Sequence, residues 1–181
     1  EKDWLNQDRP YVRVEHITLP SQDSIDKAVE KNIGFVTQPI FLYAEIESYL
    51  QNLGEDIMKE CYPIKSLLEQ KVNLCFSTDA PATSWAVPSD PFVCIKGAVT
   101  RKAYDNTDCG DDQIIDMKTA IILYTKKSAQ IAGFKNLGQL KTGYKANFIT
   151  LDRDIFAINP QDVDKVKVNK TYINGKCIFA R

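Results

Sequence analysis

An apolar run that stops at an acidic residue and a proline most constrains the fold of this chain. Residues 72–77 are mainly apolar, and Thr78, Asp79 and Pro81 follow them. Proline cannot continue a central strand, because it lacks the backbone N–H and its ring fixes φ. We therefore expect Asp79 at the carboxyl end of a buried strand, just before a turn. In α/β folds, ligands and catalytic groups gather at this edge of the sheet.

Two earlier stretches repeat the pattern of a strand that ends in polar residues. Residues 11–18 alternate as a strand does and place His16, the chain's only histidine, at the end of an apolar face. Residues 33–38 form a second candidate strand that ends at Gln38, before a proline. A helix over residues 21–31 separates the two, and Ser21 or Asp23 can cap it. This spacing suits a right-handed parallel crossover, so the fold class is α/β.

Composition excludes several classes of protein. A length of 181 residues is enough for one domain with a hydrophobic core, and the net charge of −1 argues against a nucleic-acid or anionic-membrane surface. No apolar run approaches the roughly 20 residues of a membrane span. The five cysteines include no CxxC pair, which indicates reduced thiols in a cytoplasmic protein and no cysteine-built zinc site.

The predicted secondary structure changes from helices to short strands at Gly133. Before it, we expect a helix over residues 40–61 that breaks at Gly54, and two further helices over residues 91–102 and 117–132. After it, glycine turns alternate with short strands. The Asn-Gly dipeptide at positions 174 and 175 lies between two β-like runs and predicts a hairpin, because both turn residues need positive φ.

Four stretches together resemble the amidohydrolase superfamily of metal-dependent hydrolases. Within this superfamily, the chain resembles the branch that includes N-substituted formamide deformylases. The resemblance spans nearly the whole chain, in the family's order and spacing. Its motifs are RVEH at 13–16, STDAP at 77–81, YTKKSA at 124–129 and GQLKTGYKAN at 138–147.

The resemblance implies a TIM-type (β/α)8 barrel with a small composite β-sandwich. Residues 1–136 would hold the last three β/α units of the barrel, which contain strands six to eight, and residues 137–181 would return to the β-sandwich. A complete barrel takes roughly 250 residues. The family also draws metal ligands from a His-x-His pair and from another histidine on earlier strands, and this chain has one histidine in all. We therefore expect this chain, whose first residue is Glu1 and not Met, to be the C-terminal portion of a larger enzyme.

The resemblance assigns roles to two residues. Asp79 would be both a metal ligand and the catalytic base that takes a proton from an activated water. His16 would be a second metal ligand, or in one-metal relatives would contact the substrate carbonyl. The metal implied for the whole enzyme is divalent, with zinc expected, and we expect none bound to this chain alone. A core histidine and an Asx turn are the structural alternatives for the two residues.

Other candidate site residues follow the same strands. Gln38 could contact a small-molecule substrate or cap its turn. Trp85 and Arg101 come after the third strand and could form part of a pocket wall, the alternatives being a packed aromatic and a surface ion pair. The acidic loop over residues 105–112 lacks the spacing of an EF-hand, so we expect a solvated loop.

Three functions remain open at this point. The first is a metal-dependent hydrolase of non-peptide C–N bonds, such as amides, formamides or cyclic amides, with deamination also possible. The second is an inactive fragment that associates with another copy through exposed barrel edges. The third is a thiol hydrolase that pairs Cys75 or Cys94 with His16, although nothing marks either thiol as activated.

Overall fold

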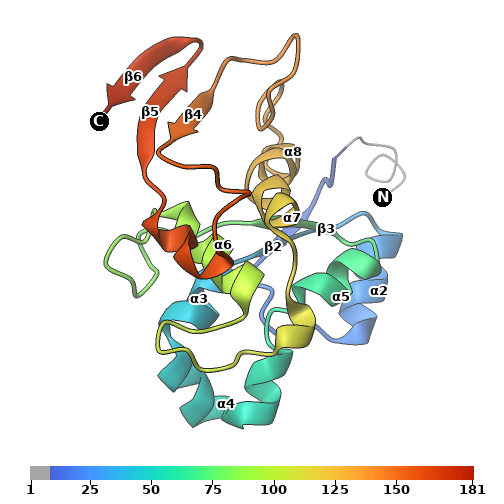
Figure 1. Cartoon of the computed structure of the whole chain (residues 1–181). Coiled ribbons are helices and arrows are strands. Elements are labelled where there is room, and N and C mark those ends of the chain that lie inside the picture. Colours follow the sequence, from blue (N-terminus) through green and yellow to red (C-terminus); the bar gives the residue numbers. More distant parts are fainter. Residues whose placement is uncertain (1–8) are drawn as a thin grey trace.

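A three-stranded parallel sheet lies at the centre of the computed structural model, which describes residues 9–181 (Figure 1). Its strands are β1 (Arg13–Glu15), β2 (Gly34–Thr37) and β3 (Asn73–Phe76), in the order β1-β2-β3. The first residues of the three strands are aligned in register. The sequence therefore predicted the parallel α/β sheet correctly. The first predicted strand was too long, because β1 ends at Glu15 and does not reach position 18.

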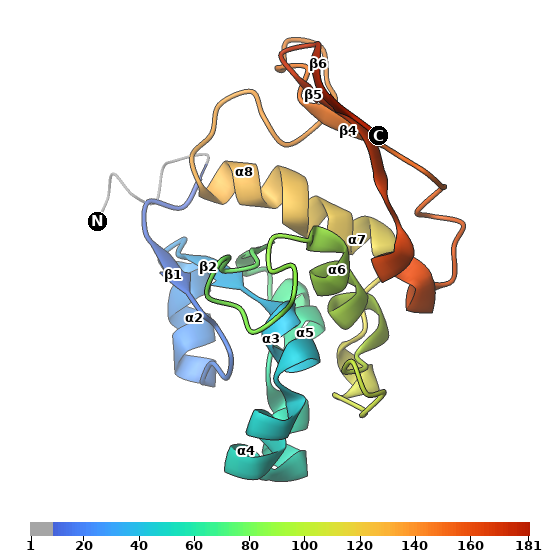
Figure 2. The same cartoon turned by 90° about the vertical axis from the view of Figure 1, so that its left-hand side faces the viewer.

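Helices cover both faces of this sheet. On one face, α2 (Gln22–Glu30) begins at Ser21, whose hydroxyl accepts a hydrogen bond from a backbone N–H as a helix cap. The buried residues of α2 belong to the same hydrophobic cluster as side chains of β2 and β3 that lie on this face of the sheet. The opposite face packs on the final helix of the α/β part, where Ile131 contacts Val36 and Cys75. Figure 2 shows the sheet between these helices.

The connection from β2 to β3 is a chain of three helices. They are α3 (Pro39–Ala44), α4 (Ile46–Glu60) and α5 (Ile64–Glu69). Gly54 has φ 77° inside α4, so the predicted break in this helix is confirmed. In both views α4 lies at the end of the molecule farthest from the second sheet (Figures 1 and 2).

After β3 the chain forms α6 (Pro91–Thr100), a 3₁₀ turn η1 (Asp111–Gln113) and a long final helix. The final helix comprises α7 (Met117–Ile122), a π-helical segment η2 (Leu123–Lys127) and α8 (Ser128–Ile131). The sequence predicted one helix here but not its wide turn. A π turn inserts an extra residue into the helical repeat and is frequent at functional sites.

A second, antiparallel sheet follows. It contains β4 (Phe148–Leu151), β5 (Val168–Ile173) and β6 (Lys176–Ala180), in that order. Asn174 and Gly175 have φ 50° and 76°, so the predicted hairpin between β5 and β6 is confirmed.

The C-terminal residues also contribute to the main hydrophobic core. The 3₁₀ segment η3 (Pro160–Lys165) packs on α6, and Val163 and Val166 are buried in the same cluster as the helices around the parallel sheet. Nearby, Lys96 on α6 and Asp164 on η3 form an ion pair at 3.1 Å. Residues on both sides of position 136 thus share one core.

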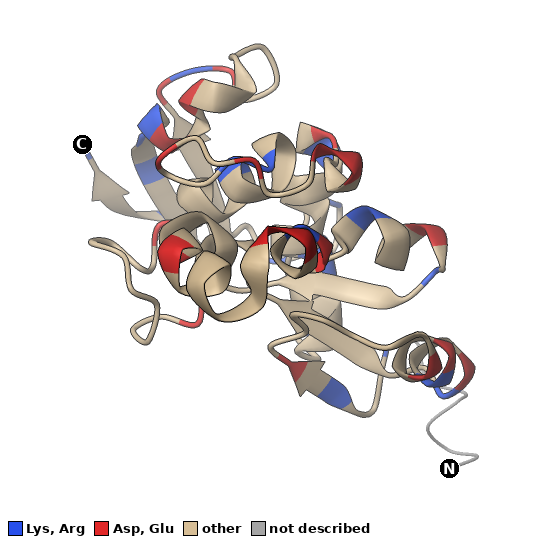
Figure 3. Ribbon diagram, turned by 90° about the horizontal axis from the view of Figure 1, so that it is seen from below, with Lys and Arg blue, Asp and Glu red and all other residues tan. Residues whose placement is uncertain are grey.

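The surface carries both signs of charge. Figure 3 shows acidic and basic residues interspersed along the helices, in keeping with the net charge of −1. Within residues 9–181 no helix is both long and apolar enough to cross a bilayer.

We predict that Val163→Ala lowers the free energy of unfolding by about 2 kcal/mol, because it removes two buried methyl groups and leaves a cavity. Chemical denaturation followed by circular dichroism measures the change. The matched control is Ile178→Ala on β6, where the side chain is 55% exposed and the expected change is within about 0.5 kcal/mol. Equal losses in the two variants would show that η3 is not anchored in the core.

Candidate active site

His16 and Asp79 meet at the carboxyl edge of the parallel sheet. Each follows the end of its strand, His16 after β1 and Asp79 after β3. Because the carboxyl ends of parallel strands share one edge, two residues 63 positions apart become neighbours. Nε2 of His16 lies 3.5 Å from Oδ2 of Asp79, and both side chains remain partly exposed. This pair therefore offers an imidazole nitrogen and a carboxylate to a ligand.

The backbone at both residues is left-handed. His16 has φ 58° and Asp79 has φ 54°. Histidine and aspartate tolerate this region better than most residues, but it is uncommon outside glycine. The left-handed turn ends the strand alternation at His16, so the apolar face predicted for residues 11–18 does not fix the direction of its side chain. Strain of this kind concentrates at functional sites.

Gln38 joins the ends of β2 and β3. Its Nε2 donates to Oγ of Ser77 at 2.9 Å, two residues before Asp79. The side chain is only 1% exposed, and within residues 9–181 its Oε1 is buried without a hydrogen-bond partner. The expected contact of Gln38 with substrate is therefore not available in this conformation. Its hydrogen bond to Ser77 instead supports the turn that carries Asp79.

Two further hydroxyl groups hold the same turn. Ser128, directly after the π segment, donates to the carbonyl of Phe76 at 2.8 Å and also to that of Leu123. Thr83 donates to the carbonyl of Thr78. The strand end before Asp79 is thus fixed from the final helix and from the following loop.

Trp85 packs among aromatic rings. Its ring meets Tyr43 edge-on with centroids 5.3 Å apart and lies 6.1 Å from Tyr104. The structural alternative for Trp85, a packed aromatic, describes this environment.

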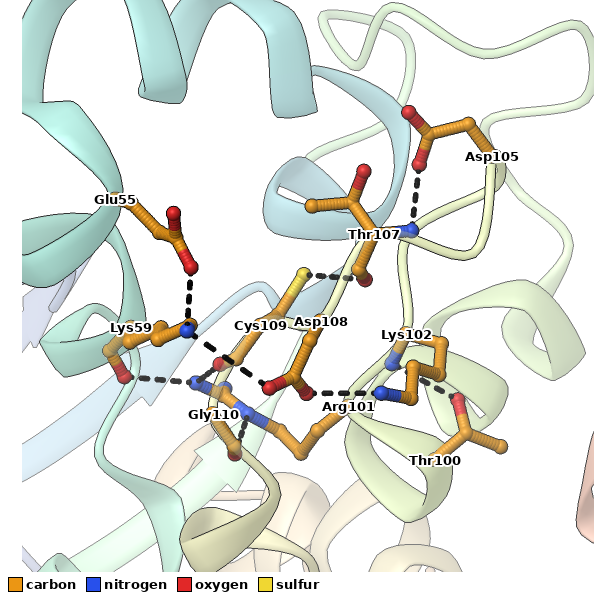
Figure 4. A network of polar contacts seen from close by, with 10 residues as sticks. All are labelled: Glu55, Lys59, Thr100, Arg101, Lys102, Asp105, Thr107, Asp108, Cys109 and Gly110. Atoms are coloured by element: carbon orange, nitrogen blue, oxygen red, sulfur yellow. Dashed lines mark hydrogen bonds and ion pairs between the residues drawn. The ribbon is translucent and has the colours of Figure 1, made fainter.

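Arg101 requires a correction. It is 1% exposed, so it neither lines a pocket wall nor forms a surface ion pair. Its guanidinium donates to the backbone carbonyls of five residues: Lys59, Cys61, Tyr62, Cys109 and Gly110. Figure 4 shows Arg101 with Lys59, Cys109 and Gly110 of this group, beside Lys102 and Asp108. Sequence analysis could not predict this role of Arg101, because backbone carbonyls are present at every residue and mark no particular partner.

His16 and Asp79 suit a divalent metal in donor type but not in number. Imidazole nitrogen and carboxylate oxygen are ordinary zinc ligands, and a catalytic zinc site normally uses three protein ligands. Within residues 9–181 no group of three or more histidine, cysteine, aspartate or glutamate side chains is arranged to hold a metal ion. The pair therefore provides two donors of this type, one fewer than such a site normally uses.

Cys75 and Cys94 are buried and are not activated as nucleophiles. Burial raises the pKa of Cys75 to about 11 and the pKa of Cys94 to about 12. Both groups are therefore protonated near neutral pH, where only a thiolate would be reactive. The thiol-hydrolase hypothesis loses its support.

Sequence reasoning missed the residues that support the loop after β1. The carbonyl of Thr18 accepts from the N–H of Tyr62 at 2.6 Å, and their hydroxyls lie 3.3 Å apart. Tyr62 is buried in the helical connection and lies 44 positions from Thr18. No local pattern relates two such distant residues.

Comparison with known proteins identifies the family. The model of the Amidohydrolase family matches residues 1–179. A putative amidohydrolase YtcJ of Bacillus subtilis is 30% identical over 173 residues, which cover 93% of this chain and 32% of the relative. An N-substituted formamide deformylase of Arthrobacter pascens is 22% identical, with 94% and 31% covered. The chain spans about a third of the length of these curated relatives.

Solved structures agree in fold. An uncharacterized metal-dependent hydrolase from Pyrococcus horikoshii is 29% identical with a TM-score of 0.70, and the match covers 82% of this chain and 30% of that protein. An adenosine deaminase from Xanthomonas campestris with bound zinc has a TM-score of 0.65 at 20% identity, with 93% and 37% covered.

We predict that a disulfide reagent such as DTNB labels one thiol of the native chain rapidly and all five after denaturation. Cys177 is exposed, whereas Cys61, Cys75, Cys94 and Cys109 are buried. The matched variant Cys177→Ser should abolish the rapid phase. Rapid labelling that persists in this variant would contradict the burial of the other four thiols.

Proposed function

The chain belongs to the amidohydrolase family, and from this premise we propose that it is the C-terminal part of a metal-dependent hydrolase of non-peptide C–N bonds. The observation that carries the proposal is the pairing of His16 with Asp79 at 3.5 Å, at the sheet edge where α/β enzymes hold their ligands. The share of its relatives that the chain covers, about a third, supports a longer whole protein.

In this proposal, the parallel sheet forms strands six to eight of a (β/α)8 barrel. Residues 1–136 would be the barrel part, of which residues 1–8 lie outside the described residues, and residues 137–181 would be part of a β-sandwich. The open edges of β1 and β3 within the described chain support a larger sheet. One face of the antiparallel sheet supports a second layer, because Ile149, Ile173 and Phe179 are each nearly half exposed.

Asp79 would handle the proton. Its carboxylate would accept a proton from the attacking water and return it to the leaving nitrogen, so one group would serve as base and then as acid. A divalent metal, with zinc expected, would supply Lewis acidity that polarises the carbonyl and lowers the pKa of water. His16, 3.5 Å from this carboxylate, would hold the metal or donate to the substrate carbonyl.

The proposed substrate is a small amide, formamide or cyclic amide. The similarity to an N-substituted formamide deformylase supports the formamide class, at 22% identity. Deaminases among the relatives, such as a 5-methylthioadenosine/S-adenosylhomocysteine deaminase of Dictyoglomus thermophilum at 25% identity, support an aminated ring as the competing substrate. Both reactions use water to break a C–N bond. The buried, reduced thiols support a cytoplasmic location.

We predict that the whole protein, supplied with zinc, hydrolyses at least one member of a panel of formamides, amides, cyclic amides and aminated heterocycles. Asp79→Asn should lower kcat/KM by roughly 10²- to 10⁴-fold, because the base is lost while the side-chain volume is kept. Removal of metal with a chelator should abolish turnover, and zinc should restore it. Ammonia or amine release measures each rate.

The matched control is Asp56→Asn, which neutralises an exposed carboxylate on α4 and should leave the rate unchanged. No turnover of any member of the panel by the metal-loaded whole protein would overturn the proposal. An Asp79→Asn variant that keeps full activity would overturn the role of Asp79 alone.

A second function has its own observation, the exposed edge of β1. All three residues of this strand are exposed, and a hollow of about 380 Å³ beside it is lined in part by Val14, Ile33 and Phe35. Unpaired strand edges favour pairing with another chain. The chain on its own could therefore be a catalytically inactive module that self-associates.

We predict that sedimentation velocity of the 181-residue chain shows a faster species that grows with concentration. Val14→Lys should suppress it, because a charge on an edge strand blocks pairing. Val87→Lys, at an exposed loop position, is the matched control and should not. A single monomeric species at every concentration would contradict self-association.

A further inference from the structure

The backbone of His16 is fixed from one side by Thr18. The N–H of Thr18 donates to the carbonyl of His16 at 2.9 Å, which closes a tight turn directly after β1. Between them, the carbonyl of Ile17 accepts from the hydroxyl of Thr37 at 3.1 Å. The imidazole itself is half exposed, so its direction depends on how firmly this turn is held.

Thr18 is held in turn by Tyr62. The N–H of Tyr62 donates to the carbonyl of Thr18 at 2.6 Å, and the hydroxyl of Thr18 donates to that of Tyr62 at 3.3 Å. The hydroxyl of Tyr62 also lies 2.7 Å from that of Tyr49. Tyr62 is 1% exposed, and burial holds the pKa of its hydroxyl well above the ordinary value, so the group stays neutral.

The conformation of Tyr62 needs support. Its φ is 54°, a left-handed value that is a genuine outlier for a bulky side chain. Arg101 provides that support, since its guanidinium donates to the carbonyls of Tyr62 at 3.2 Å and Cys61 at 3.0 Å. The same guanidinium joins this segment to the loop after α6 through the carbonyl of Gly110 at 3.0 Å (Figure 4).

We propose that Tyr62 is a positioning residue for His16, acting through Thr18, and that Arg101 holds Tyr62 in place. Hydrogen bonds to backbone carbonyls link Arg101 to Tyr62, Tyr62 to Thr18 and Thr18 to His16. The bond between the hydroxyls of Thr18 and Tyr62 is the side-chain contact by which Tyr62 itself positions this turn. The inference rests on the proposed function only in giving His16 its chemical task. The position of His16 in the His16–Asp79 pair thus depends on Tyr62, which lies in the helical connection between β2 and β3.

The test uses the single histidine as a reporter. Because the chain has one histidine, the imidazole carbon–proton spectrum of the labelled 181-residue chain contains only the signals of His16. At fixed pH, Tyr62→Phe and Thr18→Val should each move these signals by more than their linewidth. Both variants remove a partner of the hydrogen bond between the two hydroxyls while keeping the size of the side chain.

Two matched variants separate positioning from general stability. Thr18→Ser keeps the hydroxyl, so its His16 signals should stay at the wild-type positions, unlike those of Thr18→Val. Tyr49→Phe removes the other hydroxyl that contacts Tyr62 and should lower the melting temperature without moving them. Circular dichroism establishes that each variant is folded.

Unmoved His16 signals in folded Thr18→Val and Tyr62→Phe would overturn the inference and leave the proposed hydrolase untouched. If Tyr62→Phe fails to fold, Thr18→Val decides the matter alone, because Thr18 is only partly buried. Conversely, a whole protein without hydrolase activity would overturn the proposed function and leave the NMR result standing.

Discussion

Parallel pairing of three short strands is the constraint on which the candidate site depends. Aligned register brings the carboxyl ends of β1, β2 and β3 to one edge, although the residues there are far apart in sequence. Each strand has only three or four residues, so backbone hydrogen bonds between the strands hold their ends only weakly. Side-chain hydrogen bonds hold the strand ends in addition. Gln38 links the ends of β2 and β3, and Ser128 fixes the last carbonyl of β3.

The guanidinium of Arg101 is a buried charge that forms no ion pair with a carboxylate of residues 9–181. Desolvation lowers its pKa from the ordinary value, yet five carbonyl dipoles surround it. Arginine suits this task because its planar group directs five N–H donors along fixed directions. Lysine could not reach the same acceptors from one point. The hydrogen bonds to these carbonyls offset the cost of burying the charge and join the segment around Cys61 to the loop after α6.

Much of the fold could be predicted from sequence, and the site only in part. Strand ends marked by prolines gave the parallel sheet, and Asn-Gly gave the hairpin, because these signals act within a few residues. The proximity of His16 and Asp79 followed from strand geometry. Gln38 was expected to contact substrate or cap its turn, and Arg101 to line a pocket or form a surface ion pair, but both side chains are buried. Such contacts depend on distant parts of the chain, and a single sequence does not encode them locally.

Four non-glycine residues of the site and its support share a left-handed backbone: His16, Tyr62, Asp79 and Arg101. For an ordinary residue this conformation costs roughly 1–2 kcal/mol, so surrounding contacts must impose it. At Tyr62 and Arg101 those contacts are visible as hydrogen bonds to buried carbonyls. At His16 and Asp79 the side chains remain partly exposed, so the strain is maintained where no burial of these side chains compensates for it. Strained and exposed residues that are held in place by buried contacts are the arrangement expected of a preorganised site, and His16 and Asp79 would be two members of the proposed one.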